Sequence, residues 1–217
     1  MSLDPQASTA DKPKLRGILH LVAAPVAVPA AWMLASHARA ELQLAAAAFG
    51  LSLAAMLATS ATYHVPKWSP RRRAMLQRID HAMIFVLIGG TYAPYLAALG
   101  DHIPDAYRWL IVAGTVAGVT RSLVVRAKTK LGRVVSYGAL IVASVLVMPR
   151  IQAILGTSIV ALLFVGCCIY GLGAVAYARK KPNPWEGVFG HHELFHLAVI
   201  VGAAFHFVAA WWAVGAL

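Results

Sequence analysis

Seven apolar runs of about 20 residues, separated by short polar segments, dominate this sequence, and each is long enough for one helix to cross a bilayer. The runs predict membrane-spanning helices over residues 17–36, 42–63, 79–99, 106–125, 133–149, 152–177 and 191–215. A composition of 60% hydrophobic and 12% charged residues agrees with this reading. We therefore expect an all-α integral membrane protein, with one seven-helix domain over residues 12–217 after a short disordered tail at 1–11.

The lysines and arginines predict the orientation of the bundle. Sixteen of the 19 lie before the first predicted helix or at the second-to-third, fourth-to-fifth and sixth-to-seventh connections. Only Arg39, Arg108 and Arg150 lie on the other side. Because cytoplasmic loops are enriched in Lys and Arg, we expect a cytoplasmic N-terminus, an external C-terminus and a multi-pass location in the cytoplasmic (plasma) membrane. The net charge of +11 is spread over short loops rather than one face, which argues against nucleic-acid binding.

Polar side chains from three predicted helices should meet at the inner leaflet. His64 ends the second predicted helix, Asp80 begins the third, and His192 and His196 begin the seventh. Residues four apart lie on one face of a helix, so His192 and His196 present two imidazoles together. The predicted topology alone places all four side chains at the same depth.

Three histidines and a water would complete a tetrahedral zinc centre of the catalytic type. His64, His192 and His196 are the candidate Zn²⁺ ligands. Asp80 is a fourth ligand or orients the water, and Ser60, one turn before His64, is a candidate hydroxyl donor. A simpler alternative is that Asp80 pairs with Arg78.

Three further polar side chains lie on the same helices. His20 and His206 either line a cavity or form hydrogen bonds between helices. Glu193 completes a His-Glu-x-x-His pattern, in which the Glu is the general base of a metallopeptidase. An intramembrane protease of that kind takes its third ligand from a later helix, whereas here the third ligand would come from upstream. Glu193 is therefore either a general base or a polar residue of the first helical turn.

Three motifs resemble the haemolysin III-like branch of the progestin and adipoQ receptor family. They are Ser-Ala-Thr-Tyr-His at 60–64, Arg-Ile-Asp-His at 78–81 with Gly-Gly-Thr-Tyr-Ala-Pro at 89–94, and Phe-Gly-His-His-Glu-Leu-Phe-His at 189–196 with His206. The resemblance implies seven helices, zinc on His64, His192 and His196, Asp80 contacting the metal-bound water, and Ser60 nearby. Related alkaline ceramidases imply hydrolysis of a lipid amide within the bilayer.

Three functions follow as expectations. The first is a zinc-dependent hydrolase of a lipid amide or ester, with a membrane lipid as substrate. The second is a non-enzymatic haemolysin III-type protein, a lipid sensor or receptor, in which zinc is structural. The third is the His-Glu-x-x-His protease. A structural zinc site is closed by four protein ligands, whereas a catalytic one keeps an open position, so the coordination shell distinguishes the first two.

Overall fold

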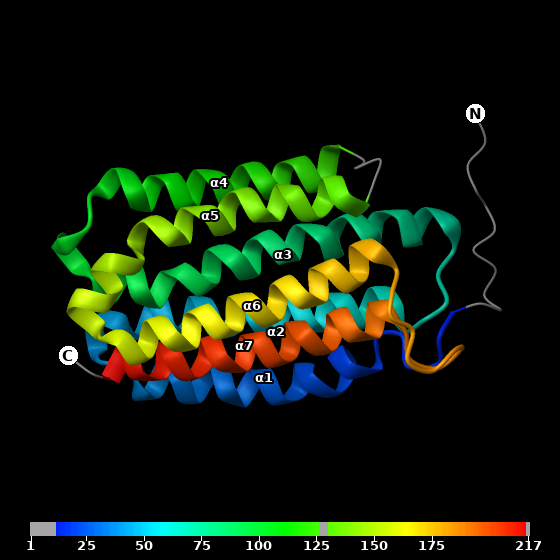
Figure 1. Ribbon diagram of the computed structural model, residues 1–217, viewed down its shortest axis with the longest axis horizontal. Helices are drawn as coiled ribbons and strands as arrows, with labels where there is room; N and C mark the ends of the chain where they lie inside the picture. Colours follow the sequence, from blue (N-terminus) through cyan, green and yellow to red (C-terminus); the bar gives the residue numbers. More distant parts are fainter. Residues whose placement is uncertain (1–11, 126–129, 216–217) are drawn as a thin grey trace.

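Seven long helices run side by side along one axis of the computed structural model, which describes residues 12–125 and 130–215 (Figure 1). They are α1 (Ile18–His37), α2 (Gln43–His64), α3 (Pro70–Ala98), α4 (Asp105–Val124), α5 (Lys130–Leu155), α6 (Thr157–Arg179) and α7 (His191–Gly215). Two short 3₁₀ turns, Ala40–Leu42 and Gly100–His102, follow α1 and α3. The predicted all-α, seven-helix fold is confirmed. The predicted tail at 1–11 lies outside the described residues.

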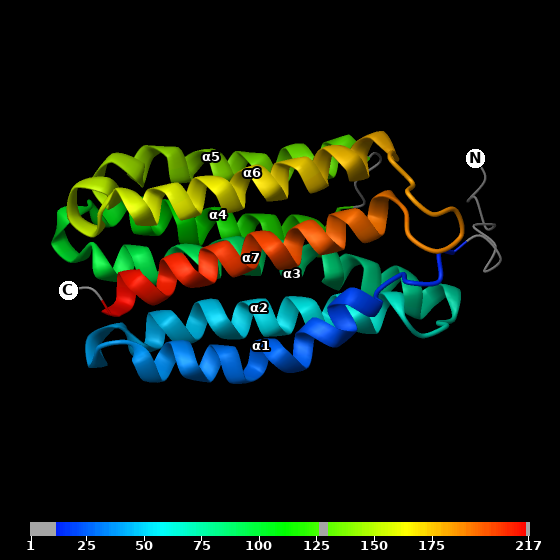
Figure 2. The ribbon, with the colours of Figure 1, turned by 60° about the horizontal axis from the view of Figure 1, so that its bottom comes forward.

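The helices pack in chain order around the bundle. Each of α1 to α6 contacts the next helix, α7 returns to contact α1, and α3 also contacts α7 across the bundle. Figure 1 shows α7 between α6 and α1, and Figure 2 shows α1 and α2 side by side below α7. This arrangement brings the first turns of α7 to the same end of the bundle as the last turn of α2 and the first turns of α3.

Large apolar side chains face outward, as lipid contact requires. Trp32, Leu44, Phe164 and Leu172 are all strongly exposed, whereas many buried positions of α2 and α7 hold alanine or glycine. Small residues allow membrane helices to approach closely. Helices α1, α2, α3, α6 and α7 are each long and apolar enough to cross a membrane, and α5 contains a shorter apolar stretch, Leu140–Leu155. The chain is a multi-pass integral membrane protein.

Two predicted helix boundaries were wrong. We expected a break between 149 and 152, but α5 continues through Pro149 and Arg150 to Leu155. The chain turns instead at Gly156, whose φ of 100° is easily reached only by glycine. Helix α3 begins nine residues earlier than expected, with Pro70 in its first turn, so the basic residues after it are helical rather than part of a loop.

Close packing of α6 on α7 depends on a reciprocal pair of glycines. A Cβ added at Gly166 would lie 2.3 Å from Cδ2 of His206, and one added at Gly202 would lie 2.7 Å from Cε1 of Tyr170. Each helix therefore lays an aromatic ring over a glycine of the other. His206 is buried in this contact between α6 and α7.

Candidate metal centre

His64, His192 and His196 converge at one end of the bundle. One potential ligand atom from each lies within 4.8 Å of the others. The ring centroids are 4.7 Å apart for His64 and His192, 5.0 Å for His64 and His196, and 4.7 Å for His192 and His196. Imidazoles that share one tetrahedral ion at metal–nitrogen distances of about 2 Å have ring centres about 5 Å apart. The three histidines are thus arranged so that they could bind a metal ion.

Asp80 lies beside this group. Its Oδ2 atom is 4.0 Å from Nε2 of His64, and its carboxylate forms a hydrogen bond with the side chain of Ser60, which is buried one turn before His64. Arg78, the alternative partner of Asp80, instead donates from Nη1 to the carbonyl oxygen of Leu123 at 3.2 Å. The carboxylate of Asp80 is therefore directed to the histidines.

Glu193 has a different environment. Its Oε2 atom accepts a hydrogen bond from the backbone N–H of Gly190 at 2.8 Å, and its Oε1 atom accepts one from Nε of Arg16. The first contact caps the start of α7, and the second joins α7 to the segment before α1. The carboxylate is completely buried and both of its oxygens are engaged. It is not among the three grouped side chains that could bind a metal ion.

Of the two other predicted histidines, only His20 reaches the cluster. Its ring stacks on that of His196, with centroids 4.0 Å apart and planes 9° apart, and it is buried. His206 lies ten residues after His196, about 15 Å further along α7. Its Nε2 atom is 3.9 Å from Sγ of Cys167. His20 therefore supports a candidate ligand directly, whereas His206 does not.

A segment before α1, residues 12–17, lies across the end of the bundle, and we call it the N-terminal strap. The backbone N–H groups of Lys14 and Leu15 donate to the carbonyls of Gly187 and Val188, at 3.0 and 3.2 Å. Gly17 has a φ of 85°, and a Cβ added there would lie 2.6 Å from Cβ of His64.

The strap was not recognised as part of the site from sequence. Lys12 and Arg16 were counted only for their charge in the topology prediction, although Lys12 Nζ donates to the carbonyl oxygen of His64 and Arg16 binds Glu193. Gly17, the first residue of the first predicted helix, was a local signal of an unusual backbone next to the site.

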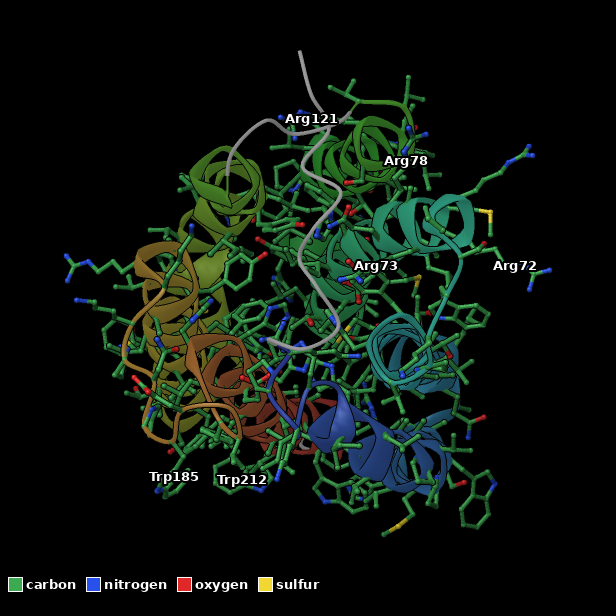
Figure 3. The ribbon with its side chains drawn as sticks, turned by 90° about the vertical axis from the view of Figure 1, so that its right-hand side faces the viewer. Arg72, Arg73, Arg78, Arg121, Trp185 and Trp212 are labelled. Carbon is green, nitrogen blue, oxygen red and sulfur yellow. The ribbon has the colours of Figure 1, made fainter. Side chains whose placement is uncertain are left out.

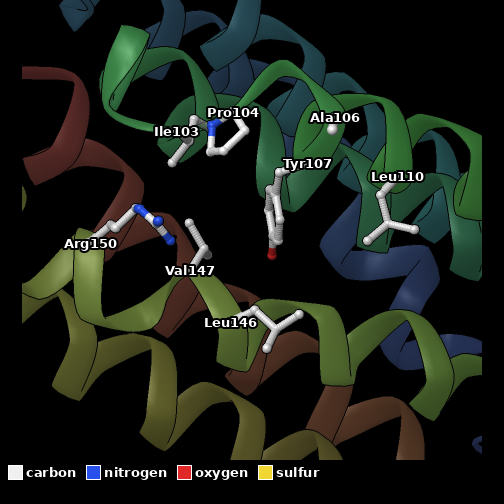
Figure 4. Close-up of a pocket in the computed structure, with 8 residues that line it drawn as sticks. All are labelled: Ile103, Pro104, Ala106, Tyr107, Leu110, Leu146, Val147 and Arg150. Carbon is white, nitrogen blue, oxygen red and sulfur yellow. The ribbon is translucent and has the colours of Figure 1, made fainter.

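A pocket in another part of the bundle is separate from this centre. It has a volume of about 280 Å³ and lies between α4 and α5 at the opposite end, where Tyr107 and Arg150 line it (Figure 4). Its walls are otherwise apolar. It contains none of the candidate metal ligands.

The fold and the histidine group together define a class: a multi-pass helical membrane protein with a candidate metal centre at one end of its bundle. The profile of one family, described as Haemolysin-III related, matches residues 8–207. The chain belongs to this family, as the resemblance of its three motifs predicted.

Similar proteins come from bacteria, plants and animals. The chain is 27% identical to Hemolysin-3 of Bacillus cereus over 201 residues, which cover 88% of this chain and 86% of that protein. It is 25% identical to the Monocyte to macrophage differentiation factor of Homo sapiens over 175 residues, covering 75% and 67% of the two chains. It is 31% identical to Heptahelical transmembrane protein 5 of Arabidopsis thaliana over 181 residues, covering 74% of this chain and 47% of that one.

Proposed function

We propose that this protein is a zinc-dependent intramembrane hydrolase that cleaves an amide or ester bond of a membrane lipid at the cytoplasmic leaflet. The observation that carries the proposal is the grouping of His64, His192 and His196 beside Asp80. Within residues 12–125 and 130–215 the group contains three protein ligands and no fourth. A centre with three protein ligands keeps one position for water or substrate, as catalytic zinc sites do.

The donor set suits zinc, because neutral imidazoles are among its preferred ligands. Zinc supplies two effects when bound: it lowers the pKa of water to about 7 and polarises a substrate carbonyl. Asp80 would orient the attacking water, accept its proton and return that proton to the leaving group. The hydroxyl of Ser60, hydrogen-bonded to Asp80, would hold the carboxylate in place.

The burial of the site residues indicates from which side a substrate would approach. His196 and His64 are buried, with exposed fractions of 2% and 8%. His192 is half-buried, and 13% of the Asp80 side chain is exposed. A substrate would therefore reach the centre past His192 and Asp80, while His20 of α1 covers His196.

The protease alternative receives no support from the position of Glu193. A general base needs an oxygen within reach of the attacking water, and both oxygens of Glu193 already accept hydrogen bonds from Arg16 and Gly190. The structural-zinc alternative differs from the hydrolase in the role that it gives Asp80. A hydrolase needs Asp80 as a proton acceptor beside the metal, whereas a lipid sensor does not.

The test uses purified protein with metal content measured by inductively coupled plasma mass spectrometry. We expect one zinc per chain in the wild type and loss of zinc in His192→Ala. The matched control is His191→Ala, because His191 is the neighbouring residue but bonds Asn183 instead of joining the cluster. This control should keep its zinc.

Asp80→Asn should retain zinc and thermal stability but lose about 100-fold or more of the rate of ceramide hydrolysis, the usual contribution of general acid–base catalysis. Full activity in Asp80→Asn would refute the assigned role of Asp80. A folded wild-type protein that never binds zinc would refute the whole proposal. Zinc without hydrolysis of any lipid amide or ester would favour the sensor.

A further inference from the structure

Three cationic side chains surround the candidate metal centre, each bonded to a residue that is a candidate ligand or adjoins one. Lys12 donates to the carbonyl oxygen of His64. Arg16 binds Glu193, the neighbour of His192. Arg73 forms a side-chain hydrogen bond with Tyr63, the neighbour of His64. The strap and α3 thus place positive charge around the ends of α2 and α7 that carry the candidate ligands.

Only one of these cations is neutralised. Arg16 pairs with Glu193, whereas Lys12 and Arg73 bond a carbonyl and a phenol, and neither forms an ion pair with any carboxylate of the described residues. Like charges held together in this way favour the binding of an anion between them.

The positive-inside rule alone does not explain this convergence, because it requires basic residues near the cytoplasmic ends but no particular direction. Two neighbouring arginines of α3 point in different directions. Arg72 extends away from the bundle, whereas Arg73 lies over the middle of its end (Figure 3). Arg73 also precedes Asp80 by seven residues, which places the two on one face of α3, about 10 Å apart along the axis.

We infer that the substrate is an anionic lipid whose phosphate monoester headgroup is bound by Lys12 and Arg73, while its amide or ester carbonyl reaches the metal centre. The inference rests on the proposed hydrolase and names its substrate class. In the reaction, the oxygen of water bonds to the carbonyl carbon and the C–N or C–O bond breaks. The leaving nitrogen or oxygen takes up a proton, and the phosphate is unchanged.

The experiment compares two lipids that differ only in the phosphate, ceramide 1-phosphate and ceramide. Binding to zinc-loaded protein in nanodiscs of neutral lipid is measured for the wild type, Arg73→Ala, Lys12→Ala and the control Arg72→Ala. We expect the wild type to bind ceramide 1-phosphate at least ten-fold more tightly than ceramide, and this preference to shrink at high ionic strength.

Arg73→Ala and Lys12→Ala should each lose about ten-fold in affinity for ceramide 1-phosphate, equivalent to one charge-assisted hydrogen bond, and should bind ceramide as before. Arg72→Ala should match the wild type. Inorganic phosphate at the same concentration should not displace the lipid, whereas displacement would identify free phosphate as the ligand and overturn the lipid assignment.

Hydrolysis is measured on the same samples, so that the two proposals fail separately. Equal binding and cleavage of the two ceramides would overturn the anionic-substrate inference and leave the hydrolase intact. Arg73-dependent binding of ceramide 1-phosphate without cleavage would support the headgroup site and count against the hydrolase. Equal losses in Arg72→Ala and Arg73→Ala would show a general surface-charge effect and refute the site.

Discussion

The buried contact between Arg16 and Glu193 should contribute measurably to stability and nothing directly to proton transfer. Glu193→Ala removes two hydrogen bonds to a charged group, one from Arg16 and one from the N–H of Gly190. At about 1.5 kcal/mol each, the lower end of the range for such bonds, the expected loss in free energy of unfolding is about 3 kcal/mol. The lower end applies because 18% of the Arg16 side chain is exposed to solvent.

Two further variants separate charge from shape. Glu193→Gln keeps an oxygen that can accept from Gly190 but loses the charge opposite Arg16, so about 1.5 kcal/mol should be lost. Arg16→Met should cost more, about 3 kcal/mol or above, because it leaves the fully buried carboxylate of Glu193 without its cation. The double variant Arg16→Met/Glu193→Gln should lose less free energy of unfolding than the sum of the two single variants, since both remove the same interaction.

The assay is equilibrium unfolding in mixed detergent micelles, with zinc content and hydrolysis measured on the same preparations. The expected order of stability is wild type, Glu193→Gln, then Arg16→Met. If Glu193→Gln were as stable as the wild type and retained zinc but lost all hydrolysis, Glu193 would be a general base. The reasoning from its two hydrogen bonds would then be refuted.

Three other predictions follow from the packing and the charge pattern. Gly166→Ala should destabilise the bundle by about 2 kcal/mol in the same assay, because its Cβ would meet His206. The control Gly171→Ala, with open space around it, should be neutral or stabilising, and equal effects of the two would contradict the packing argument. Gly17→Ala should lose zinc, because its Cβ would displace His64, the candidate ligand on α2. The control Gly100→Ala, which also has a positive φ but no neighbour within 4 Å, should retain zinc. Zinc retained in Gly17→Ala would refute this role of the strap. A C-terminal alkaline phosphatase fusion should be active and a β-galactosidase fusion inactive, with the reverse result overturning the orientation.

The candidate site could be predicted from sequence to the extent that it depends on helix ends. Apolar runs and basic loops predicted that His64, Asp80 and His192 lie at the same end of the bundle, and α7 begins and ends where its apolar run does. Being at the same end does not determine which helices are neighbours in the bundle. The resemblance to the family, together with the predicted shared end, was enough to predict that these side chains form one site. The structure then brings them within reach of one another.

Contacts between distant segments could not be predicted in the same way. The pairing of Arg16 with Glu193 joins residues 177 positions apart, and charge counting treats Arg16 only as a topology signal. The end of α5 was also misplaced, because Pro149 and Arg150 look like a helix end while the turn actually needs the backbone freedom of Gly156. Hydropathy reports neither backbone conformation nor long-range pairing.

The order of the ligands along the chain has a consequence for biogenesis. Two of the three histidines are carried by α7, and the strap that covers the third pairs with the loop just before α7. Because the chain is synthesised from its N-terminus, α1 to α6 are made before α7, and His64 and Asp80 are present before their histidine partners. On the proposed zinc hydrolase, the three-histidine centre would be complete only once the seventh helix is in place, and a shorter chain would have neither a loaded centre nor activity toward lipids.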